Sequence, residues 1–357
     1  MEKAHQLLDH YTDYLITSTR STTATGLSLI LGSEFSHDSF TRLLSEGSYG
    51  SKELWNLVKP AVRKNEIADG ILIFDDTISH KPHTDENELI GWHYDHTKGR
   101  SVKGINLLTG LYVGKEDMGI PIVFDLVTKV LDETTKKPKS KISKNKRMLN
   151  CFDQVIKNEV KFKWVVTDIW FGSAENMAYI QSKEKDFIMP LKQNRKVALS
   201  VEDQKNKKYV PIESLKLRPG DCKEVYLEKI PFPVTLIKEE YVNKDLSTGF
   251  LYLVCSDKKV NYQEIITLYQ KRWKVEEYHK SLKNNASLSK SPTKTVKTQS
   301  NHVFMSLIGY CKLEMMKMQR GLNHFALKAE LYTKAMVIAM QEFRKANVGI
   351  QLKLNFA

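Results

Sequence analysis

Four polar side chains on one predicted helix have the types and spacing for phosphate or metal chemistry. They are Tyr269, Arg272, Glu276 and Lys283, within the stretch LYQKRWKVEEYHKSLK. At about 100° per residue they fall within a sector of about 60° around a helix axis, so a carboxylate would lie among cations. The alternative is an exposed helix whose Arg272–Glu276 pair contributes only about 0.3–0.5 kcal/mol.

The spacing of these residues resembles a known signature. Tyr-x2-Arg-x3-Glu-x6-Lys, with RW at 272–273, EE at 276–277 and HK at 279–280, is similar to the signature of DDE transposases of bacterial insertion sequences. The resemblance is to the branch that includes the family-four insertion sequences. It implies that Glu276 is the last member of an Asp-Asp-Glu metal site. It also implies two aspartates upstream, each at the end of a hydrophobic strand.

The run ILIFDDT supplies the first aspartate. Residues 71–74 are continuously apolar, which is typical of a central strand buried on both faces. The family pattern of an aspartate followed directly by threonine favours Asp76, which precedes Thr77. Strand alternation sends Asp75 to the opposite face. Asp75 is therefore the alternative ligand.

The run FKWVVTD supplies the second aspartate, Asp168, again at the end of a short strand. The spacings are 168 − 76 = 92 residues and 276 − 168 = 108 residues. In the family, a β-rich insertion separates the second aspartate from the glutamate. The stretches VYLEKI, PVTLIKEEYV and FLYLVCS predict such β-rich structure here.

Asp76, Asp168 and Glu276 can act together only if a ribonuclease H-like sheet brings two strand ends and a helix side by side. Three carboxylates could then hold two divalent ions about 3.5–4 Å apart. Hard oxygen ligands suit Mg²⁺ or Mn²⁺. Water or a DNA 3′-OH would attack a phosphodiester without a covalent protein–DNA link.

Cations near these motifs are candidates for contacts with DNA phosphates, because arginine offers a planar fork and lysine a mobile point charge. In the family, the residues of the signature helix contact transposon-end DNA. The predicted DNA-binding residues are Tyr269, Arg272, Lys280, Lys283, Lys192, Arg195 and Arg42.

Composition favours a polyanionic partner. The 357 residues include 55 Lys and Arg against 42 Asp and Glu, a net charge of +13. No apolar run approaches the roughly 20 residues that a membrane span needs. The N-terminus lacks a signal peptide's apolar region. The four cysteines have no CxxC spacing, so we expect reduced thiols in a cytoplasmic, nucleoid-associated protein.

The predicted fold is α/β: a ribonuclease H-like mixed sheet flanked by helices, with a β-rich insertion and a helical N-terminal region. The helices around Arg42 could form a helix-turn-helix or a plain helical hairpin. The expected organisation is a helical DNA-binding region at 1–66, a catalytic core at 67–196 and 259–321, the insertion at 197–258 and a C-terminal helix at 322–357.

Two further segments could have a function but also have a simpler interpretation as protein surface. His80, His83, His93 and His96 form two H-x2-H pairs, but no matching cysteines support zinc, so DNA-backbone contact or plain surface is favoured. Residues 136–147, KKPKSKISKNKR, are rich in lysine and contain no acid. This segment is interpreted as a solvated loop, which is compatible with contacts to phosphates.

The sequence therefore predicts a cut-and-paste DNA transposase. It would bind terminal inverted repeats and target DNA, and would act as a homodimer that pairs two transposon ends. The alternatives are a domesticated relative that binds DNA without transposing, another metal-dependent nuclease of the same fold, and a basic structural DNA-binding protein. Metal-dependent nicking at a defined DNA end distinguishes these alternatives.

Overall fold

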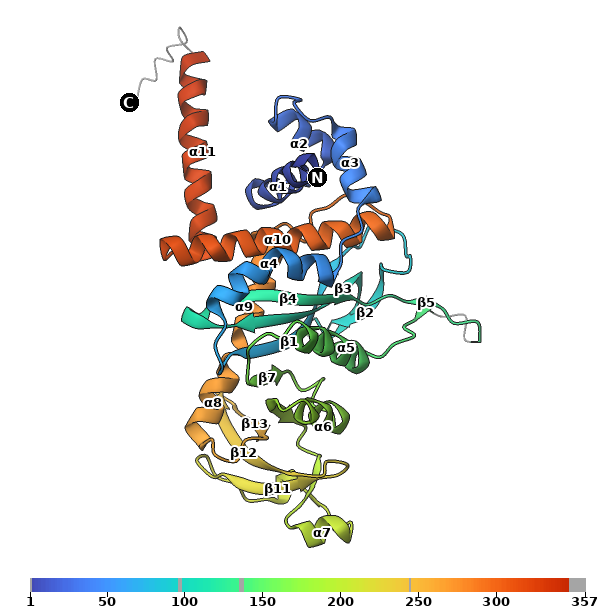
Figure 1. Ribbon diagram of the computed structural model, residues 1–357, viewed down its shortest axis with the longest axis vertical. Helices are drawn as coiled ribbons and strands as arrows, with labels where there is room; N and C mark the ends of the chain where they lie inside the picture. The colour runs from blue at the N-terminus through green and yellow to red at the C-terminus, as the bar shows by residue number, and fades with distance from the viewer. Residues whose placement is uncertain (1, 96–97, 135–137, 244, 347–357) are drawn as a thin grey trace, which may run out of the picture. The chain divides into compact units, whose positions relative to one another are not determined.

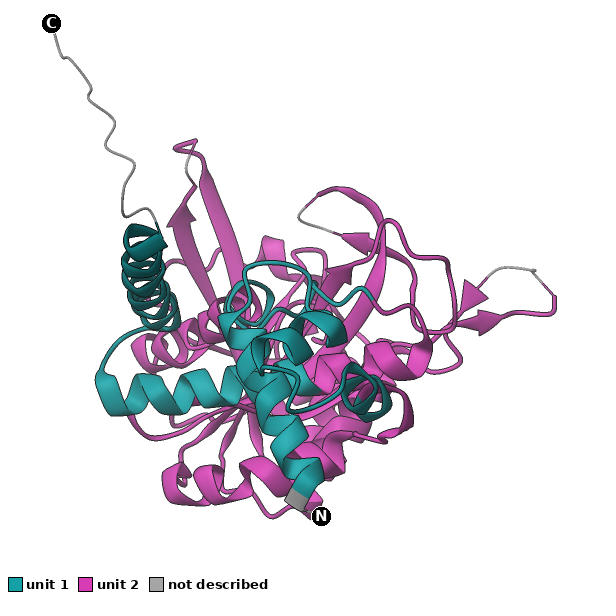
Figure 2. Ribbon diagram, turned by 90° about the horizontal axis from the view of Figure 1, so that it is seen from above, with its two compact units in different colours: residues 1–43, 281–292, 305–357 teal, residues 44–280, 293–304 magenta. Residues whose placement is uncertain are grey.

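The computed structural model describes residues 2–95, 98–134, 138–243 and 245–346. The chain forms two compact units, each built from separate stretches of sequence (Figure 2). Unit 1 contains Met1–Leu43, Ser281–Pro292 and Met305–Ala357, and unit 2 contains Leu44–Lys280 and Thr293–Phe304. No described helix combines the length and the apolar character that crossing a membrane would require.

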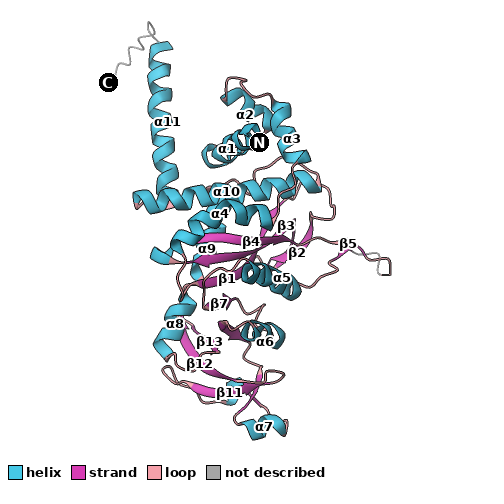
Figure 3. Cartoon of the chain, viewed as in Figure 1, coloured by secondary structure: helices cyan, strands magenta, loops and turns pink. Residues whose placement is uncertain are grey.

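Unit 2 is organised around one large mixed sheet, which Figure 3 shows in magenta. Its eleven strands within the described residues follow the order β10-β9-β11-β12-β13-β8-β7-β1-β3-β2, and β4 pairs with β3. The strands are β1 (Ile71–His80), β2 (Gly91–Asp95), β3 (Arg100–Val113), β4 (Gly119–Leu126), β7 (Trp164–Thr167), β8 (Asp186–Leu191), β9 (Lys196–Ala198), β10 (Val210–Pro211), β11 (Lys223–Leu227), β12 (Pro233–Val242) and β13 (Thr248–Cys255). A separate small sheet pairs β5 (Val130–Leu131) with β6 (Pro138–Lys139).

The centre of the sheet is its parallel part, β1-β7-β8. The apolar start of β1, residues 71–74, is buried, as is every residue of β7. This pattern is expected of strands covered on both faces. The remaining pairs are antiparallel, and β1, β3 and β4 form an antiparallel meander.

The β-rich stretch after β8 continues the same sheet. β13 pairs with β8 over Tyr252–Leu191 to Cys255–Ile188, and β12 and β11 follow outward. The prediction of antiparallel β structure at 197–258 is confirmed. The exact domain boundaries stay a prediction, because the compact units divide the chain differently.

Helices flank the sheet of unit 2 (Figure 1). α4 contacts β4, α5 contacts β4 and β3, and α6 and α8 contact β8. Their bounds are α4 (Ser51–Asn65), α5 (Lys144–Lys157), α6 (Ala174–Ser182), α7 (Val201–Lys205) and α8 (Tyr262–Gln270), with 3-10 turns at Lys115–Asp117 and Ile212–Ser214. A mixed sheet with flanking helices confirms the predicted α/β class.

Unit 1 is helical. It contains α1 (Glu2–Thr17), α2 (Ala24–Ile30), most of α3 (His37–Glu46), and α11 (His324–Ala346). It also holds the last residues of α9 (Trp273–Asn284) and most of α10 (Val296–Arg320). Tyr11, Leu15 and Phe40 are fully buried in this unit.

The two short helices around Arg42 form as predicted. Ser28 Oγ donates a 2.7 Å hydrogen bond to the carbonyl of Phe35 across the turn between α2 and α3. Whether they act as a helix-turn-helix stays a prediction. The helix expected within 322–357 is α11, which follows α10 in the chain. Residues 347–357 of the predicted C-terminal segment lie outside the described residues.

Candidate active site

The two adjacent aspartates of β1 lie on opposite sides of the sheet, because side chains alternate along a strand. Asp76 pairs in register with Leu108 of β3, and Leu108 pairs with Asp125 of β4. Asp125 accepts a 2.7 Å hydrogen bond from Arg147 of α5. The side of the sheet that carries Asp76 is therefore the side that α5 covers.

Asp168 directly follows β7 and lies beside the middle of β1, which continues to His80. Phe74 and Thr167 are the last parallel partners, so Asp75, inside β1, and Asp168, just after β7, lie at the same level. The Asp168 carboxylate accepts a 3.0 Å hydrogen bond from the backbone N–H of Trp170, which fixes the turn after the strand. The register thus associates Asp168 with Asp75.

Asp75 lies within reach of the charges of the other candidate acids. Burial is the largest cause that raises the pKa of Asp75 well above its usual value. The charges of Asp168, Asp76 and Glu276 raise it further. Burial, followed by the charge of Asp76, also raises the pKa of Asp168. Four carboxylates therefore share one neighbourhood.

The signature stretch is two helices, α8 and α9, and the prediction of one uninterrupted helix is wrong (Figure 1). Residues 271–272 separate them. The N–H of Arg272 donates to the carbonyl of Tyr269 at 2.8 Å, and that of Val275 to the carbonyl of Arg272 at 3.0 Å. These three-residue hydrogen bonds wind the chain more tightly than an α-helix does. The constant 100° step assumed for the stripe does not hold across the break.

Arg272 nevertheless joins two of the predicted residues, Glu276 and Tyr269, with the alternative ligand Asp75. Its Nη1 lies 3.3 Å from Glu276 Oε1 and 3.9 Å from Asp75 Oδ2. Its guanidinium carbon lies 5.9 Å from the centre of the Tyr269 ring. α8, α9 and the Asp75 side of β1 therefore meet at this arginine.

Asp76 has other partners. Lys144 Nζ lies 2.9 Å from Asp76 Oδ1 and 2.8 Å from Oδ2. The side-chain amide of Asn106 donates to Oδ2 at 2.5 Å. The sequence favoured Asp76 as the metal ligand, but this carboxylate is already held on the α5 side. Asp75, the alternative, faces Arg272.

Sequence reasoning missed Lys144 and Asn106 as site residues. Lys144 belongs to the basic segment that was interpreted as a solvated loop, whose residues 136–137 lie outside the described residues. The segment instead supplies the first turn of α5, capped by Ser143, whose hydroxyl accepts from the N–H of Lys146 at 3.2 Å. A serine before a helical pattern is a cap signal that could have placed Lys144 on a helix.

Comparison with known proteins identifies the family. The family model described as transposase DDE domain matches residues 67–312. The chain belongs to this transposase family. Its mixed sheet with flanking helices is the ribonuclease H-like fold of DDE transposases, and the family makes it a transposase or nuclease enzyme whose substrate is DNA.

Two other comparisons add little. The search of curated proteins found no match. Among solved structures, endonuclease V from Bacillus subtilis is similar with 8% identity over 63% of this chain and 82% of that chain. Its TM-score of 0.27 is too low for the likeness to carry an argument.

The acids of this transposase fit a divalent cation by their chemistry. Asp75 and Asp168 are acids whose pKa values are raised by burial and by neighbouring carboxylates, and a cation would relieve that repulsion. Their oxygens are hard ligands of the kind that Mg²⁺ prefers. Within the described residues, no three His, Cys, Asp or Glu side chains already stand in a metal-holding arrangement. The predicted pair of ions stays a prediction.

The predicted DNA-binding residues occupy several parts of the transposase. Tyr269 and Arg272 are half-buried at the break between the signature helices, and Lys280 is exposed on α9. Lys192 and Arg195 lie in the turn between β8 and β9, where the N–H of Arg195 donates to the carbonyl of Lys192 at 2.9 Å.

Two of the predicted residues fall in unit 1. Arg42 is exposed on α3, and Lys283 lies near the end of α9, just beyond the division between the units. Their contribution to DNA binding stays a prediction.

The histidines do not assemble a metal site among the described residues. His93 is buried on β2, and burial lowers its pKa to about 4. His80 Nε2, at the end of β1, lies 3.4 Å from Asp95 Oδ2, at the end of β2. His96 lies outside the described residues.

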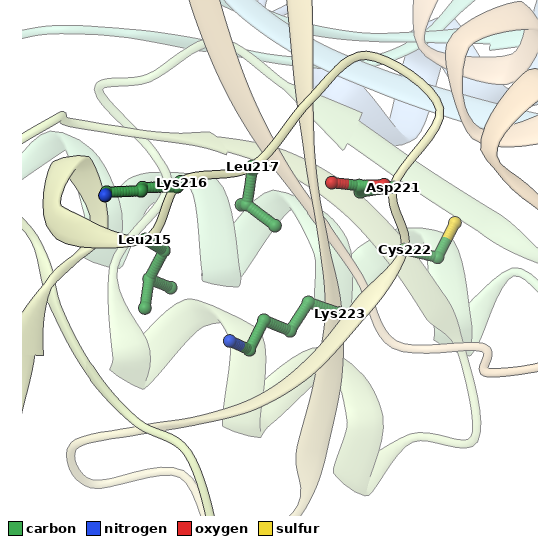
Figure 4. Close-up of a pocket in the computed structure, with 6 residues that line it drawn as sticks. All are labelled: Leu215, Lys216, Leu217, Asp221, Cys222 and Lys223. Atoms are coloured by element: carbon green, nitrogen blue, oxygen red, sulfur yellow. The ribbon is translucent and has the colours of Figure 1, made fainter.

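A hollow of about 380 Å³ lies in the β-rich part of unit 2 (Figure 4). Leu215, Leu217, Lys216, Asp221, Cys222 and Lys223 line it. None of the candidate acids lines this hollow. A substrate as large as duplex DNA does not require an enclosed pocket, so the hollow does not compete with the carboxylates as the candidate site.

Proposed function

We propose that this chain is the transposase of an insertion sequence of the Tyr-Arg-Glu-Lys branch. It binds the terminal inverted repeats of its element and catalyses metal-dependent strand cleavage and strand transfer by the cut-and-paste route. The main support is the meeting of Asp75, Asp168 and Glu276 around Arg272, where the parallel pairing of β1 with β7 ends.

The proposed ligand set is Asp75, Asp168 and Glu276. Asp75 replaces the Asp76 favoured from sequence for two reasons. The parallel register brings Asp168 level with Asp75, and the Arg272 that contacts Glu276 also lies beside Asp75. Divalent ions bound there would supply activation of the attacking water or 3′-OH and stabilisation of the leaving oxygen.

The remaining groups bind and orient the phosphodiester. Arg272 presents a planar fork suited to the two oxygens of a phosphate. Burial raises the pKa of Tyr269 to about 12, so its hydroxyl keeps its proton at neutral pH and can donate to a phosphate oxygen. Lys280 is exposed on the same helix as Glu276 and adds a mobile positive charge.

The proposed working form is a homodimer that bridges two DNA ends, because cutting both ends of an element requires two active sites. The net charge of +13 opposes association of free monomers, and DNA phosphates neutralise that charge. Light scattering with and without inverted-repeat DNA tests this step. A monomer that cuts each end normally would overturn the paired-end form.

The function is tested by cleavage of a labelled fragment that carries the inverted repeat found beside the gene. We expect Mg²⁺-dependent nicking at the repeat end in wild type and none with Asp168→Asn. Specific binding without cleavage would indicate a domesticated relative. Cleavage without preference for the repeat would indicate another nuclease of this fold.

A further inference from the structure

We propose that Lys144 is a positioning residue of the carboxylate site. Lys144 holds the Asp76 carboxylate on the α5 side of β1 and balances the negative charge of Asp76. Of the two adjacent aspartates, Asp75 is then the one that acts as a metal ligand. This inference rests on the proposed function.

The contact between Lys144 and Asp76 is two-pronged and partly shielded. One ammonium lies within 2.9 Å of both carboxylate oxygens, and the exposed side-chain fractions are 31% for Lys144 and 16% for Asp76. An ion pair in such a site is stronger than one on the surface, since less water screens it. The basic segment therefore directs one lysine inward.

Lys144 also reaches the turn after the second strand. Its ammonium lies 5.7 Å from the centre of the Trp170 ring. The backbone N–H of Trp170 donates to Asp168 at 3.0 Å. One side chain thus contacts the neighbour of the first ligand and the residue that fixes the second. Its removal would loosen both β1 at Asp76 and the turn after β7.

Asn106 cannot replace this cation. Its amide donates to Asp76 Oδ2, but an amide carries no charge. Without Lys144, Asp76 would be an uncompensated carboxylate directly beside the ligand set. The Asp76 carboxylate would repel the neighbouring acids. It would also compete with them for the divalent ion from the α5 side of β1.

The competing explanation is a direct contact between Lys144 and DNA. The two explanations differ in what a second substitution does. If Lys144 compensates Asp76, then Asp76→Asn should relieve the defect of Lys144→Met, because a neutral pair leaves no unbalanced charge. If Lys144 binds a phosphate, Asp76→Asn should give no relief.

The experiment uses the full chain and an inverted-repeat fragment, with cleavage measured over a range of Mn²⁺ concentrations. We expect Lys144→Met to reduce cleavage by about 10- to 100-fold and to raise the Mn²⁺ concentration needed for half-maximal rate. Lys144→Arg should restore much of the loss. The double variant Lys144→Met/Asp76→Asn should cut at least about tenfold faster than Lys144→Met. Lys157→Met, at an exposed position in the last turn of α5 and outside the basic segment, is the matched control and should behave as wild type.

A readout without cleavage comes from the thermal midpoint of the protein alone. The increase on adding Mn²⁺ should be smaller in Lys144→Met and recovered in the double variant, which also shows that both variants fold. The proposal is overturned if the double variant is no better than Lys144→Met. It is also overturned if Lys144→Met lowers the salt slope of DNA binding by about one unit, as removal of a phosphate-binding charge would. Failure of wild type to cut would instead overturn the proposed function.

Discussion

The two sides of β1 place the same residue type in contrasting surroundings. On one side, Asp75 is buried near other acids, and Arg272 approaches no closer than 3.9 Å. On the other side, Asp76 is paired with Lys144 and hydrogen-bonded to Asn106. On the first side one arginine faces several acids, so a cation could bind there, and on the second side the Asp76 charge is paired with Lys144. This contrast agrees with the proposed ligand set on the Asp75 side.

The largest expected effect comes from substituting Asp168 or Glu276, the two proposed ligands outside the aspartate pair of β1. Asp168→Asn and Glu276→Gln should each reduce cleavage of the inverted-repeat fragment by more than about 100-fold, since an amide cannot replace a ligating carboxylate. DNA binding, measured by gel shift, should stay nearly intact. Wild-type cleavage by either variant would remove that residue from the site.

Substituting Asp75 and Asp76 separately tests the comparison between the two sides of β1 directly. Asp75→Asn should be as inactive as Asp168→Asn. Asp76→Asn should keep measurable cleavage, with a loss of about 10- to 100-fold, because it disturbs a supporting contact and not a ligand. Single-turnover cleavage in Mg²⁺ measures both. An inactive Asp76→Asn beside an active Asp75→Asn would place the ligand set on the α5 side.

A smaller effect is expected from the cations of the signature helices. Arg272→Ala and Lys283→Ala should each weaken end binding and lower its salt slope by about one unit, because each removes one charge that binds a phosphate. Lys258→Ala is a control, because Lys258 Nζ pairs with Glu224 at 2.7 Å in the β-rich part of unit 2. Fluorescence anisotropy in a salt titration gives the slopes. Unchanged slopes in both variants would exclude these phosphate interactions.

The smallest effect concerns stability without metal. The pKa of Asp75 is raised in the folded state, so the folded chain holds a proton there that the unfolded chain has released. Wild-type stability should therefore fall as pH rises from about 4 through the raised pKa. Asp75→Asn removes this cost, and its thermal midpoint should exceed that of wild type by about 2 °C or more at pH 8.

The gain in Asp75→Asn should vanish below about pH 3, where Asp75 is protonated in both the folded and the unfolded wild type. Differential scanning fluorimetry at several pH values measures it. Added Mn²⁺ should stabilise wild type more than the variant. A midpoint for Asp75→Asn below that of wild type at pH 8 would contradict the view that the Asp75 charge is uncompensated.

Much of the fold follows from local patterns in the sequence. The apolar run before Asp75, the short strand before Asp168 and the alternating stretches at 197–258 all predicted strands that form. The helix expected within 322–357 forms as α11. The alternating stretches and the helix are long or periodic, and the two runs before the aspartates are continuously apolar; such signals favour one local structure.

Other features depend on partners distant in sequence, which a local pattern does not contain. Asp75 and Asp76 differ only in what lies across the sheet, and Lys144, 68 residues beyond Asp76, decides the surroundings of the latter. The break at 271–272 also escaped prediction, since the segment has neither glycine nor proline to signal it. The basic composition of residues 136–147 did not predict the contact of Lys144 with Asp76, because composition does not indicate where a side chain points.

The continuous sheet of unit 2 fixes the distance between β1 and β12. β12 lies four strand steps from β1 along the path β1-β7-β8-β13-β12. At about 4.8 Å per step, these strands are held roughly 19 Å apart by unbroken backbone hydrogen bonds. DNA rises about 3.4 Å per base pair, so this spacing corresponds to roughly five or six base pairs. A hinged insertion would let that distance vary, whereas a shared sheet keeps it constant from one turnover to the next.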